Sequence, residues 1–273
     1  MIDYHLHSNV SHDAVGSLLE HARQAERAGI SEICFTEHLD FYPSEDGLSC
    51  RTIPTQPELD RYLVELRQAA KQTPVVLRAG VELDYKPEAG RWVQELVDRY
   101  STSFDFLLGS VHNVDSLGIS DRDGAMRYFG ERGPWQGCLD YYEVVEKAVA
   151  TGLFDSFAHL DLMKRFRPEN GELMMQRELR DRMEAILDLL AATGTGLEIN
   201  GGGLIHDPRE AYPSLGLLRL ARERGVAILT VGSDSHRPET VGRHVADCIS
   251  LAREAGYGRV WTFEKRVGRA EAI

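Results

Sequence analysis

The stretch IDYHLHS, residues 2–8, is a short apolar run that ends in two histidines. Successive side chains of a β-strand point to opposite faces, so His5 and His7 are expected on the same face. Short runs of apolar residues are typical of strands that a parallel sheet buries on both sides. The stretch therefore predicts a buried strand that carries two imidazoles at its carboxyl end.

The same type of apolar run returns six more times along the chain. These runs are Glu32–Thr36, Val75–Leu83, Phe104–Val111, Phe154–Ala158, Leu197–Asn200 and Ala227–Gly232. Stretches with helical spacing lie between them, at Ser17–Ala28, Glu58–Lys71, Trp92–Tyr100, Tyr141–Ala150, Leu173–Ala192, Leu215–Arg224 and Val241–Ala255. The alternation predicts one α/β domain, residues 1–273, with a parallel sheet. Seven strands, or eight with Val260–Phe263, fit a barrel better than a short open sheet. Asp40–Pro57 and Asn113–Cys138 are expected to be long loops.

Composition narrows the class of protein. The formal charge is −12, from 43 acidic and 31 basic residues, which argues against a nucleic-acid partner. No stretch approaches the roughly 20 apolar residues of a membrane helix. The first residues carry no basic or apolar leader, and we expect no secretory signal. Cys34, Cys50, Cys138 and Cys248 form no CxxC pair, which favours reduced thiols in a cytoplasmic protein.

Polar residues of the types that bind metals follow nearly every predicted strand. In chain order they are His5 and His7, Glu37 and His38, Glu82, His112, His159, and Asp234 with His236. In a parallel barrel the carboxyl ends of the strands share one face, so we expect these side chains to converge. Burying so many imidazoles and carboxylates together is costly without a compensating cation.

This set of residues favours a catalytic metal site over a structural one, because it contains no cysteine. Ligands of this kind accept Zn, Mn and Fe alike, and the Glu82 carboxylate can bridge two ions. Two or three adjacent metals are the usual solution for phosphoester hydrolysis, in which they acidify a water and orient the phosphate. A single-metal amidohydrolase also uses an HxH pair in a barrel, but nine or more candidate ligands exceed its needs.

Several motifs resemble those of the PHP-domain phosphoesterases. They are YHLHS, FTEH, AGVELDY, GSVHN, FAHLDL and GSDSH, and they run in order from Ile2 to about His244. The stretches AHLDLMKRF (158–166), LEING (197–201), YPS (212–214) and VGSDSHRPETVG (231–242) are most similar to the monofunctional histidinol-phosphate phosphatases. The resemblance implies hydrolysis of the small phosphomonoester L-histidinol phosphate in histidine biosynthesis.

The resemblance also implies a distorted seven-stranded (β/α) barrel with three divalent metal ions. Carried over by motif, the first ion takes His5, His7, Glu82 and Asp234, and the second takes Glu82, His112 and His159. The third takes His38, His236 and one residue after the HxH pair. The family generally has a histidine six residues beyond that pair, where this chain has Asp13. The spacing favours Asp13 as the third ligand, and the neighbouring His12 is the alternative.

Substrate contacts are expected close to these motifs. Lys164 and Arg165 follow His159 and are placed for charge-assisted hydrogen bonds to phosphate, although they also suit a solvated helix start. Family members carry a basic residue soon after LEIN, and in GGGLIHDPREAYPS the candidates are His206 and Arg209.

Other polar residues near the motifs have expected roles in catalysis, substrate binding or structure. His206 or a metal-bound water is the expected acid for the leaving alcohol. Glu45 or Asp46 is expected to meet the substrate's ammonium group. Glu198 and Asn200 are expected to orient ligands or to serve packing. We interpret His21 and His244 as structural or surface residues.

Three other functions remain open at this point. The first is another phosphoesterase of the same superfamily, acting on nucleotides, DNA ends or phosphotyrosine. The second is an amidohydrolase with a mononuclear site or a carboxylated lysine. The third is a binding module that retains a relic of the site, which the nearly full ligand set disfavours.

Overall fold

The computed structural model describes residues 1–273 except 41, 45–46, 50–55, 101, 167–176 and 208. Seven strands form one parallel sheet in the spatial order β1-β2-β5-β6-β9-β10-β11. Their bounds are Ile2–Leu6 (β1), Glu32–Leu39 (β2), Val76–Asp84 (β5), Phe106–Ser110 (β6), Ser156–Phe157 (β9), Gly196–Asn200 (β10) and Leu229–Gly232 (β11). All seven predicted strands are present, in the predicted order.

The sheet curves until its two edge strands nearly meet. The backbone N–H of His7 donates to the carbonyl of Ser235, and that of Asp234 donates to the carbonyl of His5, both over 2.8 Å. These two bonds join the end of β11 to the end of β1. The predicted seven-stranded barrel is therefore confirmed.

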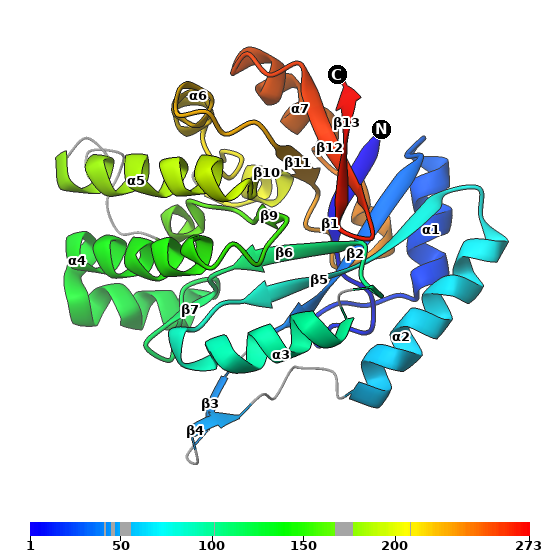
Figure 1. Cartoon of the computed structure of the whole chain (residues 1–273), viewed down its shortest axis with the longest axis horizontal. Coiled ribbons are helices and arrows are strands. Elements are labelled where there is room, and N and C mark those ends of the chain that lie inside the picture. Colours follow the sequence, from blue (N-terminus) through cyan, green and yellow to red (C-terminus); the bar gives the residue numbers. More distant parts are fainter. Residues whose placement is uncertain (41, 45–46, 50–55, 101, 167–176, 208) are drawn as a thin grey trace.

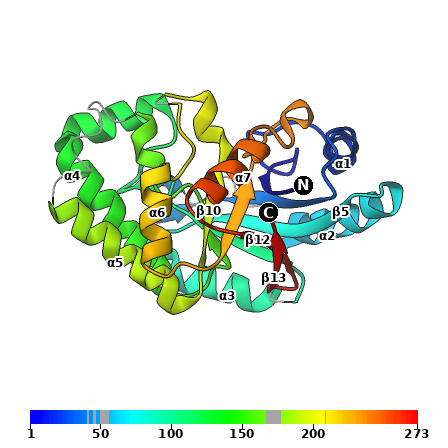
Figure 2. The same ribbon diagram turned by 90° about the horizontal axis from the view of Figure 1, so that it is seen from above.

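Helices surround the strands (Figures 1 and 2). They are α1 (Leu18–Arg27), α2 (Gln56–Ala69), α3 (Gly90–Tyr100), α5 (Arg177–Thr193), α6 (Leu215–Glu223) and α7 (Val245–Glu254). Ser17 and Glu20 form a capping box at the start of α1, which satisfies backbone N–H groups that the first turn leaves unpaired. Leu18, Ala22 and Ala25 on that helix are buried, and Leu19 is partly buried against the same core.

The stretch Asn113–Cys138 is not a loop, contrary to the prediction. It contains a small hairpin, β7 (Asn113–Val114) with β8 (Leu117–Gly118), followed by α4 (Arg122–Ala150). The axis of α4 is broken at Gly133, which has a φ of 74°, and Pro134 opens the segment beyond the break. Proline is well tolerated in a first helical turn, so a second helical segment starts at the break. Two shorter helices therefore meet within a stretch that was expected to be a loop.

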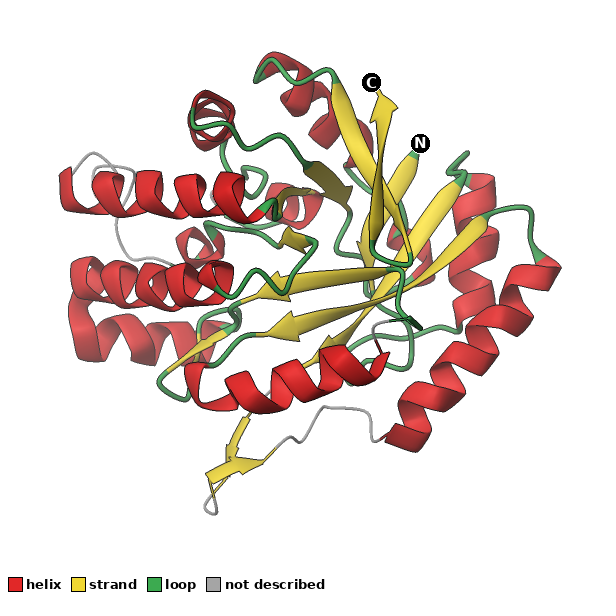
Figure 3. Ribbon diagram, in the orientation of Figure 1, coloured by secondary structure: helices red, strands yellow, loops and turns green. Residues whose placement is uncertain are grey.

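The possible eighth strand exists but lies outside the barrel. β12 (Arg259–Glu264) pairs with β13 (Val267–Ala272) in an antiparallel hairpin, drawn with the other strands in Figure 3. The Tyr4 hydroxyl accepts a hydrogen bond from the N–H of Phe263 over 2.8 Å. The turn of the hairpin bonds to Asp105, just before β6, where the Arg266 N–H donates to the Asp105 carbonyl. The hairpin therefore covers the amino ends of the strands.

The other expected long loop contains a second hairpin, β3 (Tyr42–Ser44) with β4 (Gly47–Ser49), at the bottom of Figure 1. Among the described residues, Cys34, Cys138 and Cys248 are buried and form no disulfide. None of the helices in the described ranges has the length and apolar character of a membrane span. The short 3-10 turns are η1 (Ala70–Gln72), η2 (Pro87–Ala89), η3 (Leu162–Arg165), η5 (Gly201–Ile205) and η6 (Pro238–Thr240).

Candidate metal centre

The candidate ligands gather at the carboxyl ends of the strands. His112, His159 and Asp234 each stand two residues after the last residue of a strand, and His7 stands one residue after β1. The backbone φ angles of His159 and Asp234 are 25° and 57°, in a region that residues other than glycine rarely adopt. Such conformations cost about 1–3 kcal/mol each and are concentrated at functional sites.

The first group consists of His5, His7, Glu82 and Asp234. The Nε2 atoms of His5 and His7 are 3.1 Å apart. His5 Nε2 lies 3.3 Å from Glu82 Oε2 and 3.5 Å from Asp234 Oδ1, and His7 Nε2 lies 3.6 Å from each of the same oxygens. Ligands about 2.0–2.1 Å from a tetrahedral metal are about 3.3–3.4 Å from one another. The spacing of these four side chains is therefore that of a coordination shell.

Glu82 links this group to a second one. Its other oxygen, Oε1, lies 3.3 Å from His112 Nε2 and 2.9 Å from His159 Nε2. The two imidazole nitrogens are 3.3 Å apart. The two oxygens of this carboxylate thus face different histidines, with His38 Nδ1 also 3.1 Å from Oε2, and a carboxylate placed in this way could bridge two ions.

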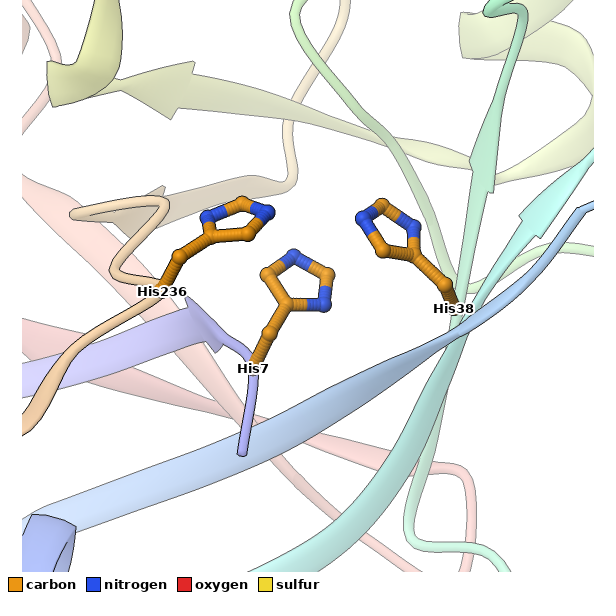
Figure 4. Close-up of side chains that lie close together, drawn as sticks. All are labelled: His7, His38 and His236. Atoms are coloured by element: carbon orange, nitrogen blue, oxygen red, sulfur yellow. The ribbon is translucent and has the colours of Figure 1, made fainter. Parts of the chain in front are cut away.

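The third group is formed by Asp13, His38 and His236. Asp13 Oδ2 lies 3.6 Å from His38 Nε2 and 3.3 Å from His236 Nε2. Figure 4 shows the rings of His38 and His236 beside that of His7, from three separate segments. The ring centroids of His7 and His38 are 4.1 Å apart. The structure therefore brings all three predicted groups into one cluster.

The neighbour of Asp13 has a different position. The side chain of His12 is 40% exposed, and its Nδ1 lies 4.0 Å from Asp13 Oδ1. Its ring centroid is 5.7 Å from that of His38. Asp13 Oδ2 contacts the Nε2 atoms of both histidines of the third group, and this geometry favours it as the ligand.

The charges of the cluster depend on one another. Burial raises the pKa of the Glu82 carboxyl, but His112 and His5 lower it more, and the net pKa is well below its ordinary value. Burial lowers the pKa of His112, but Glu82 and Asp40 raise it well above the usual range. His7 has a pKa well below the ordinary value because of burial and the nearby rings of His38 and His236. The Glu82 carboxylate therefore stays ionised and favours a positive charge on the groups around it, whereas the His7 imidazole stays neutral.

A divalent cation fits this set of residues. Glu82 Oε2 is buried and receives no hydrogen bond of good geometry from the described residues, although His38 Nδ1, His5 Nε2 and His7 Nε2 lie within 3.6 Å. A buried ionised oxygen without a partner is costly. Glu82, His5 and His7 would hold a divalent cation here, which would offset the charge of the carboxylate and bind the lone pairs of both imidazoles.

An open cavity of about 620 Å³ lies against the cluster. Arg165 and His206 line it, as do Arg237 and Arg243, which the sequence analysis did not single out. Arg165 stacks on the Phe166 ring, and its buried Nε has no hydrogen-bond partner among the described residues.

The chain is similar to known proteins along nearly its whole length. The PHP domain family model matches residues 3–202. The chain belongs to the PHP domain family. The "Probable histidinol-phosphatase" of Deinococcus radiodurans is 33% identical over 270 residues, which is 97% of each chain. The "Histidinol-phosphatase" of Lactococcus lactis is 29% identical and covers 96% of this chain and 94% of that protein.

Solved structures agree with this PHP assignment. A crystal structure of histidinol phosphate phosphatase from Lactococcus lactis, complexed with zinc, L-histidinol and phosphate, has a TM-score of 0.81 at 25% identity. It covers 98% of both chains. A putative histidinol phosphatase from Listeria monocytogenes has a TM-score of 0.78 at 20% identity, over 90% of this chain and 99% of that one, and supports the fold.

Two basic residues predicted to bind substrate lie away from the cavity of this PHP domain. The Lys164 ammonium group contacts Asp161 Oδ2 at 3.0 Å and the Ala211 carbonyl at 2.7 Å. It therefore holds η3 against the segment before Pro213. The side chain of Arg209 is 72% exposed, and its nearest acidic partner is Asp207, at 3.9 Å. Neither residue is part of the cavity wall in the described part of the chain.

The remaining predicted residues fall into three groups. Glu45 and Asp46 lie outside the described residues. His21 is buried in α1, where its Nδ1 donates to the Ser17 carbonyl, and His244 precedes α7, so the structural reading of both is supported. Glu198 Oε1 lies 2.6 Å from His5 Nδ1, the position of a carboxylate that orients a ligand imidazole.

Sequence reasoning missed one acidic residue of the PHP site. Asp40 is buried and lines the cavity, with its Oδ1 3.6 Å from His38 Nδ1 and 3.5 Å from His112 Nδ1. The signal was present, because Asp40 follows His38 with alternate spacing at the end of β2. It was attributed instead to the start of a long loop.

Proposed function

We propose that this chain is a metal-dependent phosphomonoesterase that hydrolyses L-histidinol phosphate to L-histidinol and phosphate. The observation that carries the proposal is the position of Glu82, whose two oxygens face different histidines. The named activity of the relatives and the histidinol and phosphate in the Lactococcus structure support the choice of substrate. The buried thiols suit a cytoplasmic setting.

The proposed ligands are the three groups described above, and the ions are Zn, Mn or Fe. His5, His7, Glu82 and Asp234 would hold the first ion, Glu82, His112 and His159 the second, and Asp13, His38 and His236 the third. When bound, such ions acidify a water molecule and stabilise the charge on the phosphate oxygens. The chain's own task is to fix these ligands and to position the phosphoester beside them.

Arg165 is the proposed phosphate contact of the protein. Its guanidinium lines the cavity, and its Nε is buried without a hydrogen-bond partner among the described residues. A buried N–H of a permanently charged group favours an anionic acceptor. Charge that develops on the phosphate oxygens in the transition state strengthens such a bond, so Arg165 acts on both binding and rate.

His206 is the proposed contact of the leaving oxygen, because it lies in the same cavity wall as Arg165. Burial and the Arg165 charge lower its pKa below the ordinary value. The imidazole is therefore neutral at pH 7 and can donate a hydrogen bond from one ring nitrogen to the alcohol oxygen. Lys164 and Arg209 are left out of the proposed contacts because of their positions.

The decisive experiment measures phosphate release from histidinol phosphate, a nucleoside monophosphate and phosphotyrosine, with metal-analysed protein before and after chelation. We expect a strong preference for histidinol phosphate, and loss of turnover on chelation that added metal reverses. Arg165→Met should raise KM and lower kcat, whereas the adjacent Lys164→Met should leave KM unchanged. Equal slow turnover of all three substrates would leave only a general phosphoesterase. No phosphate release by fully metal-loaded protein would refute the proposal and favour an amidohydrolase.

A further inference from the structure

Asp40 lies between two of the candidate ligand histidines. It follows β2 by one residue, and its side chain is only 4% exposed. Its Oδ1 is 3.6 Å from Nδ1 of His38 and 3.5 Å from Nδ1 of His112. One carboxylate oxygen thus faces the same ring atom of two imidazoles.

These imidazoles belong to different groups of the metal centre. His112 presents its Nε2 to Glu82 Oε1 at 3.3 Å, in the second group. His38 presents its Nε2 to Asp13 Oδ2 at 3.6 Å, in the third group. When the Nε2 lone pair of a histidine binds a cation, the proton of the ring must sit on Nδ1 and needs an acceptor. Asp40 Oδ1 lies within 3.6 Å of both Nδ1 atoms, and a carboxylate oxygen is such an acceptor.

Two other carboxylates lie near these Nδ1 atoms. Glu82 Oε2 is 3.1 Å from His38 Nδ1, but the same oxygen faces His5 and His7 in the first group. Asp84 Oδ1 is 3.9 Å from His112 Nδ1 and accepts the backbone N–H of His112 over 2.5 Å. Asp40 Oδ1 is the oxygen that the two rings share.

We propose that Asp40 is a positioning residue that fixes the rings of His38 and His112 and so couples the second and third metal positions. The inference rests on the metal centre of the proposed function. It assigns to Asp40 the part that Glu198 plays at the first position, where Glu198 Oε1 lies 2.6 Å from His5 Nδ1. Carboxylates that orient metal-bound histidines typically change metal affinity by about 10- to 100-fold when they are replaced.

The test compares Asp40→Asn with Glu198→Gln, two nearly isosteric changes that remove one buried charge each. Each full-length protein is equilibrated at a series of buffered free zinc concentrations, and bound zinc is counted by elemental analysis. At a concentration where the wild type holds about three ions, we expect Asp40→Asn to hold about one and Glu198→Gln about two. Circular dichroism of the same samples verifies folding, and Asp40→Ser is the second variant if the asparagine protein does not fold.

The inference is overturned if Asp40→Asn still holds about three ions where the wild type does, or if it loses only about one ion, as is expected of Glu198→Gln. Counting ions requires no turnover. A wild-type protein that holds its ions but does not hydrolyse histidinol phosphate would therefore refute the proposed substrate and leave the role of Asp40 standing.

Discussion

The last residue of β11, Gly232, lies so close to the first metal group that a methyl group there should disturb it. A Cβ atom at this position would be 2.3 Å from Cβ of His5 and 2.6 Å from Oε1 of Glu198. It would also be 3.2 Å from Cα of His5, so rotation of a side chain does not relieve the clash. Ordinary contacts of a Cβ are 3.4–4 Å, and Gly232→Ala must therefore move His5 or β11 by roughly 1 Å.

The movement has two consequences that can be measured separately. Overpacking of this kind costs about 1–3 kcal/mol of unfolding free energy. In a chain of this size each kcal/mol lowers the Tm by about 2–4 °C. The contact of 2.6 Å between Glu198 and His5 is lost or stretched, and a misplacement of about 1 Å in an active site lowers kcat by about 100-fold.

The assay for this prediction measures bound zinc, Tm and phosphate release for Gly232→Ala and for Gly216→Ala. Gly216 lies in α6, and a Cβ there meets no atom within 4 Å. The control should bind metal like the wild type and gain about 0.5–1 kcal/mol, since alanine stabilises helices relative to glycine. If Gly232→Ala keeps the wild-type metal content and kcat, the reasoning on the close approach of β11 to His5 is wrong.

Three further predictions follow from the structure. Glu82→Gln should no longer bind the first and second ions, and its kcat should fall by at least about 100-fold, because an amide has no charge with which to bridge two ions. Glu95→Gln, on the exposed side of α3, is the control for the bound-metal and the kcat measurements. Lys164→Met should reduce the free energy of unfolding by about 1–3 kcal/mol, because the buried Asp161 carboxylate loses a donor; a denaturant titration that shows no change would contradict this role. Burial lowers the pKa of His21 in the folded protein, so as the pH falls below about 6.5 the unfolded chain takes up this proton before the folded protein does, and the free energy of unfolding falls by up to about 1.4 kcal/mol per pH unit. The asparagine of His21→Asn does not titrate, so between pH 7 and pH 5 the variant should gain stability relative to the wild type. A difference in unfolding free energy that stays constant between these pH values would contradict the prediction.

Much of the fold followed from the sequence because the strands are buried on both faces. Continuous apolar runs then mark each strand, and the polar residue after each run marks its carboxyl end. His112, His159 and Asp234 were found in this way, and the barrel brings them together with His5 and Glu82 from distant parts of the chain. The convergence is a property of parallel topology, since all seven strands end on the same side.

The errors have local causes. Asn113–Cys138 was predicted as a loop because it is rich in glycine and aspartate, which have low helix propensity. Tertiary packing overrides that propensity, and Tyr128 is fully buried, with its hydroxyl donating to the Gly137 carbonyl over 2.7 Å. Val260–Phe263 has the composition of a barrel strand, but its partner is the neighbouring β13.

The substrate contacts were harder to predict than the ligands. Lys164 and Arg165 are adjacent in η3, and consecutive residues of a 3-10 turn point in directions about 120° apart. Sequence alone gives no reason to choose between them. The structure distinguishes them, because the Lys164 ammonium donates to the Asp161 carboxylate and the Ala211 carbonyl, whereas Arg165 lines the cavity.

The bonds between the ends of β1 and β11 bring residues from the start of the chain next to residues from its last fifth. A single ion held by His5 and Asp234 would therefore act as a reversible crosslink around a loop of more than 200 residues. In the chain-entropy model of crosslinks, closing so long a loop lowers the conformational entropy of the unfolded chain and so stabilises the folded state by about 5 kcal/mol. During synthesis on a ribosome such a crosslink could form only after nearly all of the polypeptide had emerged, so metal binding by this pair would be a late step in folding.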